Sequence, residues 1–158
     1  MRLLALADAP DAFGTTLTEE SALPEDAWRQ RLVGGSRRTL LAWHPAFHPG
    51  DGVAHAMPAG IALVGPVPGD PVVVGDHGVY GLFVVPEARG TGIGEVLLAE
   101  AARIARGAGA ARLVLDVGDH NTPAQGLYHR FGFRRTGRVG SLPPPRQHVT
   151  EHELALRL

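Results

Sequence analysis

A glycine-rich segment, Arg89-Gly90-Thr91-Gly92-Ile93-Gly94, follows a β-branched and aromatic run that ends at Pro86. The segment lies at the start of an amphipathic stretch that predicts a helix. Free backbone N–H groups and the positive end of the helix dipole are therefore expected to point toward the same site. Glycine lets the main chain turn tightly and approach a ligand without a Cβ in the way, and Arg89 adds a positive charge. The pattern suits a pyrophosphate, but a turn that needs glycine only for its dihedral angles has the same appearance.

Two other phosphate-binding folds share part of this pattern. Asp116 ends the next predicted strand about 22 residues after Gly94, near where a dinucleotide-binding fold places its acidic ribose ligand. The spacing here is Gly-x-Gly-x-Gly instead of Gly-x-Gly-x-x-Gly, and the remaining chain is too short for a doubly wound sheet with a substrate domain. The chain contains no Lys, which disfavours a triphosphate P-loop. A dinucleotide-binding protein therefore stays a minor alternative.

The elements that position the glycine loop are strongly patterned. Residues 79–85 predict a strand, the stretch from Gly92 to Gly107 repeats apolar side chains at helical spacing, and residues 112–117 predict the next strand. Other predicted strands cover 38–43, 59–64, 133–139 and 148–158, and other predicted helices cover the chain start, 24–32 and 121–132. Strands interleaved with helices indicate an α/β or mixed α+β fold, in a single domain over 1–158.

Two ordered motifs resemble those of the GNAT-type N-acetyltransferases, which use acetyl-CoA. The first is the string from Leu82 to Gly94, in which a strand, a Pro and Arg-Gly-Thr-Gly-Ile-Gly open a helix. The second is Asn121-Thr122-Pro123-Ala124 followed by residues 127–133, similar to the family's Asn-x-x-Ala and Tyr-x-x-x-Gly-Phe segment. The resemblance covers about 78–140, with weaker similarity over 5–14.

The resemblance implies a cofactor site and a general acid. Backbone groups of Leu82, Phe83 and Val84 would pair with the pantetheine arm as an extra strand would. The pyrophosphate would lie on the loop and first helical turn, formed by Arg89, Gly90, Thr91, Gly92, Ile93, Gly94 and Glu95. Asn121 would contact the cofactor, and Tyr128 would donate a proton to the departing thiolate. Packed beside Leu127 and Phe131, Tyr128 could equally be a core aromatic.

The general base is less well defined. Many relatives carry a Glu near the start of the cofactor strand, where this chain has Gly78, which cannot act as a base. Relatives that acetylate the N-terminal Ala of ribosomal proteins use a Glu five residues before the Asn, and that place here is Asp116. Its strand neighbours face the opposite side of the sheet, so Asp116 points either into the cleft or to solvent. His77, Tyr80 and a relayed water are the rivals.

The fold that the resemblance implies is a central, twisted, mostly antiparallel sheet, splayed at the cofactor strand and flanked by helices. The family's first strand, before the first helix, has no residues here. An exposed sheet edge would favour pairing with a second copy, so a homodimer is an expectation. The implied function is transfer of the acetyl group of acetyl-CoA to a primary amine of a small molecule or peptide by direct attack. A CoA-binding module with little turnover is the alternative.

Composition limits the partners further. The chain has 158 residues, of which 44% are hydrophobic, and this composition disfavours disorder. Its net charge of -1 disfavours nucleic acid or a membrane as a partner. The absence of Cys and of an export signal favours a cytoplasmic location. The spacing of two histidine groups does not favour a metal site; they are His44, His48 and His55, and His148 and His152. The pairs at 37–38 and 134–135 are two candidates for the 3'-phosphate of CoA.

Overall fold

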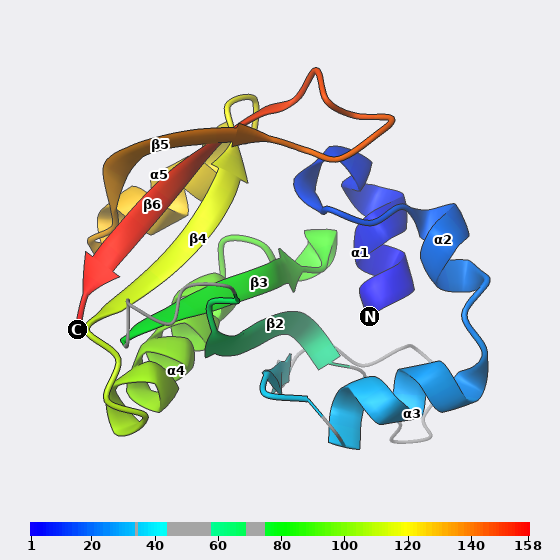
Figure 1. Cartoon of the computed structure of the whole chain (residues 1–158), viewed down its shortest axis with the longest axis horizontal. Helices are drawn as coiled ribbons and strands as arrows, with labels where there is room; N and C mark the ends of the chain where they lie inside the picture. The colour runs from blue at the N-terminus through cyan, green and yellow to red at the C-terminus, as the bar shows by residue number, and fades with distance from the viewer. Residues whose placement is uncertain (34, 44–57, 69–74) are drawn as a thin grey trace.

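The computed structural model describes residues 1–33, 35–43, 58–68 and 75–158, which build a six-stranded mixed sheet. The strand order is β1-β2-β3-β4-β6-β5, in which only β3 and β4 run parallel (Figure 1). The strands are β1 (Arg38–Trp43), β2 (Pro58–Pro66), β3 (Asp76–Val84), β4 (Arg112–Gly118), β5 (Arg134–Ser141) and β6 (Thr150–Arg157). The expected mixed, mostly antiparallel sheet is confirmed.

Helices flank this sheet, and the three N-terminal ones gather at one end of it (Figure 1). The helices are α1 (Arg2–Asp8), α2 (Leu17–Ser21), α3 (Glu25–Val33), α4 (Ile93–Gly107) and α5 (Thr122–Phe131), with 3-10 turns η1 (Pro10–Ala12) and η2 (Pro86–Ala88). The sequence patterns did not predict α2. It begins at a capping box, in which Glu19 N–H donates to Thr16 Oγ1 and the Glu19 carboxylate accepts from Thr16 N–H.

The amphipathic helix α4 packs on β2 and β3. Its buried side includes Leu97, Ala101 and Ala105, as the helical repeat predicts, and also Leu98, whereas Val96, which the repeat placed on the same face, is exposed. This packing fixes the start of α4 at the end of β3, because only η2 and a short loop lie between them.

The two parallel strands separate soon after they begin. Their register pairs Asp76 with Arg112, His77 with Leu113 and Gly78 with Val114, and the pairing stops there. Figure 1 shows β3 and β4 diverging from this point. One edge of β3 beyond Gly78 is therefore free of its neighbouring strand, which is the splayed geometry expected for a cofactor strand.

A bulge lies on β3 next to this opening. The register with β2 shifts between Ile61 and Leu63, where two residues of β3 lie opposite one residue of β2. Gly81 takes φ +62° at this bulge, a conformation that favours glycine. The bulge changes the direction of the backbone groups that follow it, at the start of the segment that includes Leu82 and Phe83.

Some expectations lie outside the described residues. These are the loop histidines His44, His48 and His55, and the run Val72–Val74, whose sequence fits either a short strand or a loop. Across the parts of the chain that the structure does describe, none of the helices combines the length and the apolar character that a membrane crossing requires.

Candidate active site

The glycine loop connects η2 to α4 with two glycines in left-handed conformations. Gly90 has φ +78° and Gly92 has φ +90°, and a Cβ at either position would meet no atom within 4 Å. Gly92 is the N-cap of α4 and supplies no side-chain cap, so the first N–H groups of the helix lack the usual side-chain acceptor. Thr91 Oγ1 instead donates to the Ala88 carbonyl over 2.7 Å. An open loop at an uncapped helix start is suited to an anion.

Gly92→Ala will destabilise the fold, because alanine resists the left-handed conformation that Gly92 adopts. The expected cost is about 1–2 kcal/mol in the free energy of unfolding, measured by urea denaturation. The matched control is Gly107→Ala at the other end of α4, where φ is not positive and a Cβ also meets nothing within 4 Å. That control should stabilise by about 0.4–1 kcal/mol. Equal effects of the two substitutions would contradict this account of the loop.

Arg89 is oriented by two contacts outside the loop. Its Nε donates to the Val84 carbonyl over 3.1 Å, and its Nη2 forms an ion pair with Asp8 at the end of α1. Its guanidinium also lies 5.8 Å from the centroid of the Phe83 ring. The charge that the sequence offered to a phosphate is thus already neutralised by a carboxylate, and the Val84 carbonyl already has a donor.

Helix α5 is anchored beside the start of α4. A Cβ on Gly94 would lie 2.8 Å from Leu127 Cδ2, so the Leu127 side chain of α5 packs closely against the start of α4. Asn121 caps α5, its Oδ1 accepting from Ala124 N–H over 3.3 Å, which leaves its amide group as a donor. The structure therefore brings the second sequence motif against the first.

Tyr128 follows Leu127 on α5 and is buried. Its ring packs against Phe133 with centroids 5.8 Å apart. Burial raises the pKa of Tyr128 to about 12, so the phenol is protonated throughout the neutral range. A neutral phenol can donate a proton, and a core aromatic would have the same burial, so both interpretations of Tyr128 agree with this environment.

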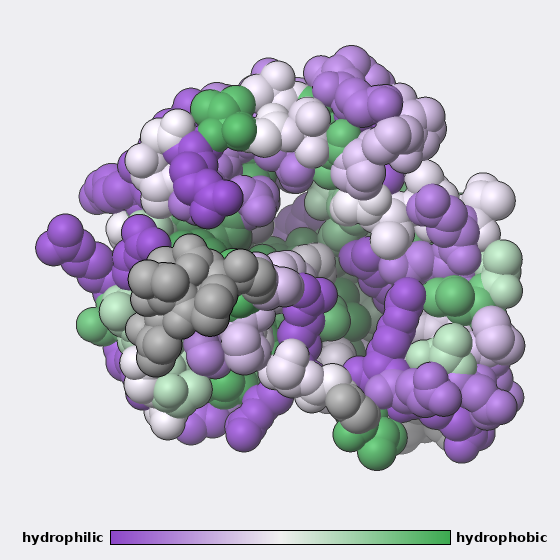
Figure 2. Space-filling model, viewed as in Figure 1, coloured by the Kyte–Doolittle hydropathy of each residue, from purple (hydrophilic) through white to green (hydrophobic). Residues whose placement is uncertain are grey.

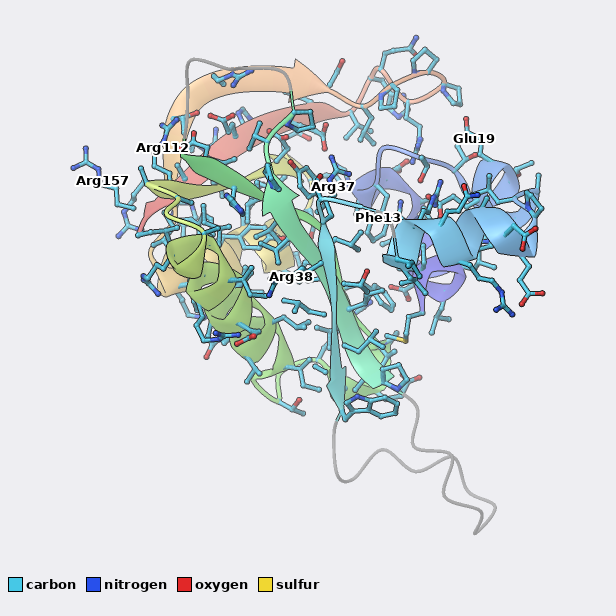
Figure 3. All side chains as sticks on the ribbon, turned by 60° about the horizontal axis from the view of Figure 1, so that its bottom comes forward. Phe13, Glu19, Arg37, Arg38, Arg112 and Arg157 are labelled. Carbon is cyan, nitrogen blue, oxygen red and sulfur yellow. The ribbon has the colours of Figure 1, made fainter. Side chains whose placement is uncertain are left out.

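A large cleft lies between the N-terminal helices and the sheet. Its volume is about 1190 Å³, and Figure 2 shows the face hollowed there. Val79, Tyr80 and Gly81 of β3 line it, and so do residues of α1, α3, β2 and β4. Figure 3 shows Arg37 and Phe13, which both line it, between the sheet and the N-terminal helices.

Asp116 lines this cleft, and its side chain is also exposed to solvent. Glu153 lies opposite it in the β4–β6 register, and Glu151, two residues earlier on the same face of β6, also lines the cleft. Burial raises the pKa of Asp116 and the charge of Glu153 raises it further, against the lowering effect of Arg138. Burial and the charge of Asp116 likewise raise the pKa of Glu151, with Arg146 opposing. The sequence interpretation missed Glu151, although its alternation with Glu153 was visible.

Tyr80 and His77 are the two other side chains considered as the general base. A Cβ on Gly78 would lie 2.4 Å from the Tyr80 ring, so the Tyr80 ring fills the space that a glutamate side chain would need there. The Tyr80 hydroxyl donates to the Pro66 carbonyl, and burial raises the pKa of Tyr80 above its ordinary value. His77 has a buried Nδ1 without a hydrogen-bond partner in the described structure. The raised pKa of Tyr80 disfavours the ionised form that would act as a base.

The described part of the chain groups no three His, Cys, Asp or Glu residues so as to hold a metal ion. His152 lies in β6 and His148 lies in the turn before it. The site consists of an open glycine loop, a splayed strand and a cleft with carboxylates on one wall.

These features agree with one family model, "Acetyltransferase (GNAT) family", which matches residues 9–133. The chain belongs to the GNAT acetyltransferase family. It is 39% identical over 67 residues to the peptidyl-lysine N-acetyltransferase of Salmonella typhimurium, covering 42% of each protein. It is 40% identical over 75 residues to the streptothricin acetyltransferase of Streptomyces lavendulae, covering 48% of this chain and 40% of that protein. These matches thus span less than half the length of either relative.

Solved GNAT structures share the fold. Arabidopsis thaliana NAA60 in complex with a bisubstrate analogue superposes with a TM-score of 0.73 at 19% identity, over 99% of this chain and 94% of that one. A GNAT family acetyltransferase from Elizabethkingia anophelis with acetyl-CoA bound gives a TM-score of 0.60 at 18% identity, over 85% and 84% of the two chains. At these identities the likeness establishes the GNAT fold alone.

Proposed function

We propose that this GNAT domain, as one unit over 1–158, transfers the acetyl group of acetyl-CoA to a primary amine. The proposal rests mainly on the opening between β3 and β4, together with the open glycine loop that follows β3 and the cleft with carboxylates that β3 also lines. A cofactor arm and an acceptor could then meet at the same strand.

The residues of this chain fit acetyl-CoA. The open loop at Gly90 and Gly92 and the uncapped start of α4 suit the pyrophosphate. The edge of β3 that includes Leu82 and Phe83 pairs with no strand in the described part of the chain and offers backbone groups to the pantetheine arm. Acetyl-CoA supplies an activated acetyl group as a thioester. The Val84 carbonyl accepts one hydrogen bond from Arg89 Nε and keeps a second lone pair for another donor.

In the proposed reaction the amine nitrogen attacks the thioester carbon directly. A C–N bond forms and the C–S bond breaks, giving the N-acetyl amine and the free thiol of CoA. The base, Asp116, takes a proton from the amine, and Tyr128 gives one to the departing sulfur and regains it from water. Amide groups of β3 beyond the bulge stabilise the oxyanion. This scheme uses a protonated phenol, which the raised pKa of Tyr128 provides, and the ionised form of the Asp116 carboxyl.

Glu153→Gln will move the acid limb of the pH profile of kcat/KM to lower pH. The charge of Glu153 raises the pKa of Asp116, and Glu153 also occupies Arg138 through an ion pair of 3.2 Å. The Glu153→Gln substitution removes the repulsion between Glu153 and Asp116 and releases Arg138 from its ion pair. Glu151 remains and still repels Asp116. Glu100→Gln on α4, whose carboxylate binds Arg103, is the control that should leave the limb in place. A limb that stays in place or rises in Glu153→Gln argues against Asp116 as the base.

The ligand of the loop is tested by calorimetric titration of the purified protein with acetyl-CoA, with NAD as the comparison. Saturable binding of acetyl-CoA alone supports the proposal. Saturable binding of NAD alone supports a dinucleotide site. Binding of neither ligand to folded protein overturns the assigned cofactor site. Binding of acetyl-CoA without transfer to any amine would favour a CoA-binding module.

A further inference from the structure

The large cleft has oppositely charged walls. Asp116 and Glu151 line it on the side of β4 and β6. Three arginines, Arg2, Arg31 and Arg37, line it on the side of the N-terminal helices and the start of β1. Sequence patterns alone did not group these residues, because they come from four separate elements and a turn.

A buried carboxylate organises the arginine wall. Glu20 is only 3% exposed and accepts hydrogen bonds from Arg2 Nη2 over 3.1 Å, Arg31 Nη1 over 3.2 Å and Thr15 Oγ1 over 2.7 Å. Burial opposes ionisation of Glu20, but these hydrogen bonds and cations lower its pKa on balance, so it is charged at neutral pH. One carboxylate thus orients two guanidinium groups, and one positive charge of this cluster is not neutralised within it.

This remaining charge lies close to the proposed reaction centre. A Cβ on Gly81 would lie 3.0 Å from Arg2 Nη1, so this guanidinium touches the bulge of β3. Arg37 adds a third cation, with its guanidinium 3.8 Å from the centroid of the Tyr80 ring. The guanidinium fork binds a carboxylate through two parallel hydrogen bonds, which makes it a specific receptor for that group.

We propose that the acceptor is a small amine that also carries a carboxylate, such as a free amino acid. Its amine would lie at the wall of Asp116 and Glu151, and its carboxylate at the wall of Arg2, Arg31 and Arg37. This inference rests on the proposed acetyl transfer. A volume of about 1190 Å³ is on the order of a small-ligand site, and Trp28, Leu41 and Leu63 add apolar surface for the rest of the molecule.

The test compares free amino acids with their carboxamides as acceptors, measuring release of the CoA thiol. The probes are glycine, β-alanine, 4-aminobutyrate, leucine and phenylalanine, each beside its amide, with rates expressed per unprotonated amine. The acids should exceed their amides in kcat/KM by about 10-fold or more, the scale of a hydrogen bond to a charged group. Amides that equal or exceed their acids overturn the inference.

Arg31→Gln isolates the contribution of the wall. The side chain of Arg31 is 48% exposed, and Glu20 keeps Arg2 and Thr15 when Arg31 is removed, so the variant should fold. We expect kcat/KM to fall about 10-fold for the acids and to stay unchanged for the amides. Arg29→Gln on the same helix, outside the cleft and paired with Glu25, should change neither. Arg37→Gln provides a second variant with the same expected selectivity.

The two proposals fail in different ways. Equal losses for acids and amides in both Arg31→Gln and Arg37→Gln overturn the carboxylate site. Acetylation of lysine-containing peptides but of no free amino acid also overturns it, while the acetyl transfer itself stands. A folded protein that does not bind acetyl-CoA overturns the acetyl transfer and with it this inference.

Discussion

Tyr128→Phe will lower kcat for acetyl transfer by about 10²- to 10³-fold, the range that positioned general acids contribute. The departing thiolate then has no phenol to protonate it, while the ring still packs against Phe133. KM for acetyl-CoA should stay within about twofold, because the hydroxyl acts in the transition state and not in ground-state binding. The measurement is steady-state release of the CoA thiol with a saturating amine.

The pH profile separates this role from a structural one. With a pKa of about 12, Tyr128 stays protonated in the neutral range, so the wild-type profile should show no loss from this group below about pH 10. Tyr80→Phe provides a comparison, because Tyr80 is the other tyrosine of the chain, lines the cleft and donates its hydroxyl to the Pro66 carbonyl. If Tyr128→Phe leaves kcat unchanged at every pH, the residue is a core aromatic.

Asp116→Asn is expected to lower kcat/KM by about 10²-fold and to remove the acid limb of its pH profile. The surroundings raise the pKa of Asp116, so wild-type activity should fall as pH decreases through that raised value and the base becomes protonated. Asn cannot accept the proton at any pH. Protonation of the substrate amine also lowers the rate as pH decreases, and this separate loss remains in both the wild-type enzyme and Asp116→Asn.

Stability distinguishes a chemical loss from an unfolded variant. The pKa of Asp116 is raised in the folded protein, so this group makes the fold less stable as pH rises above the pKa that it has in the unfolded chain. Asp116→Asn should therefore keep or increase Tm at neutral pH. Asp119→Asn, just beyond the end of β4 and with its side chain 56% exposed, is the control that should leave the rate unchanged. If Asp116→Asn keeps the acid limb of the pH profile of kcat/KM, the base is another group, and Glu151 is the first residue to test.

The unit from β3 to β4 could be predicted from the sequence because each of its elements carries a strong periodic pattern. The apolar repeat of α4 leaves only one face that can be buried, and Pro86 marks the end of the strand before it. The start of β3 was placed three residues late, since Asp76 and His77 do not look like strand residues and are held there by pairing with β4. The five-residue α2 is too short for periodicity, and only its capping box, Thr16 to Glu19, could have indicated it.

The site could be predicted only where a motif is local. The loop at 89–95 and the α5 segment each lie within a few consecutive residues, and the structure places them together through Gly94 and Leu127. The direction of Asp116 could not be read from alternation, because it depends on which face the N-terminal helices leave open. The arginine wall joins Arg2 and Arg31 through Glu20, contacts that exist only in the folded chain.

The most direct test of the central claim is incubation of the purified protein with acetyl-CoA and an amine panel, following thiol release and the mass of each amine together. We expect thiol release to require the amine, to saturate with the amine concentration and to match the N-acetyl product in amount. Thiol release at the same rate without any amine, or none with any amine by folded protein that binds acetyl-CoA, would contradict it.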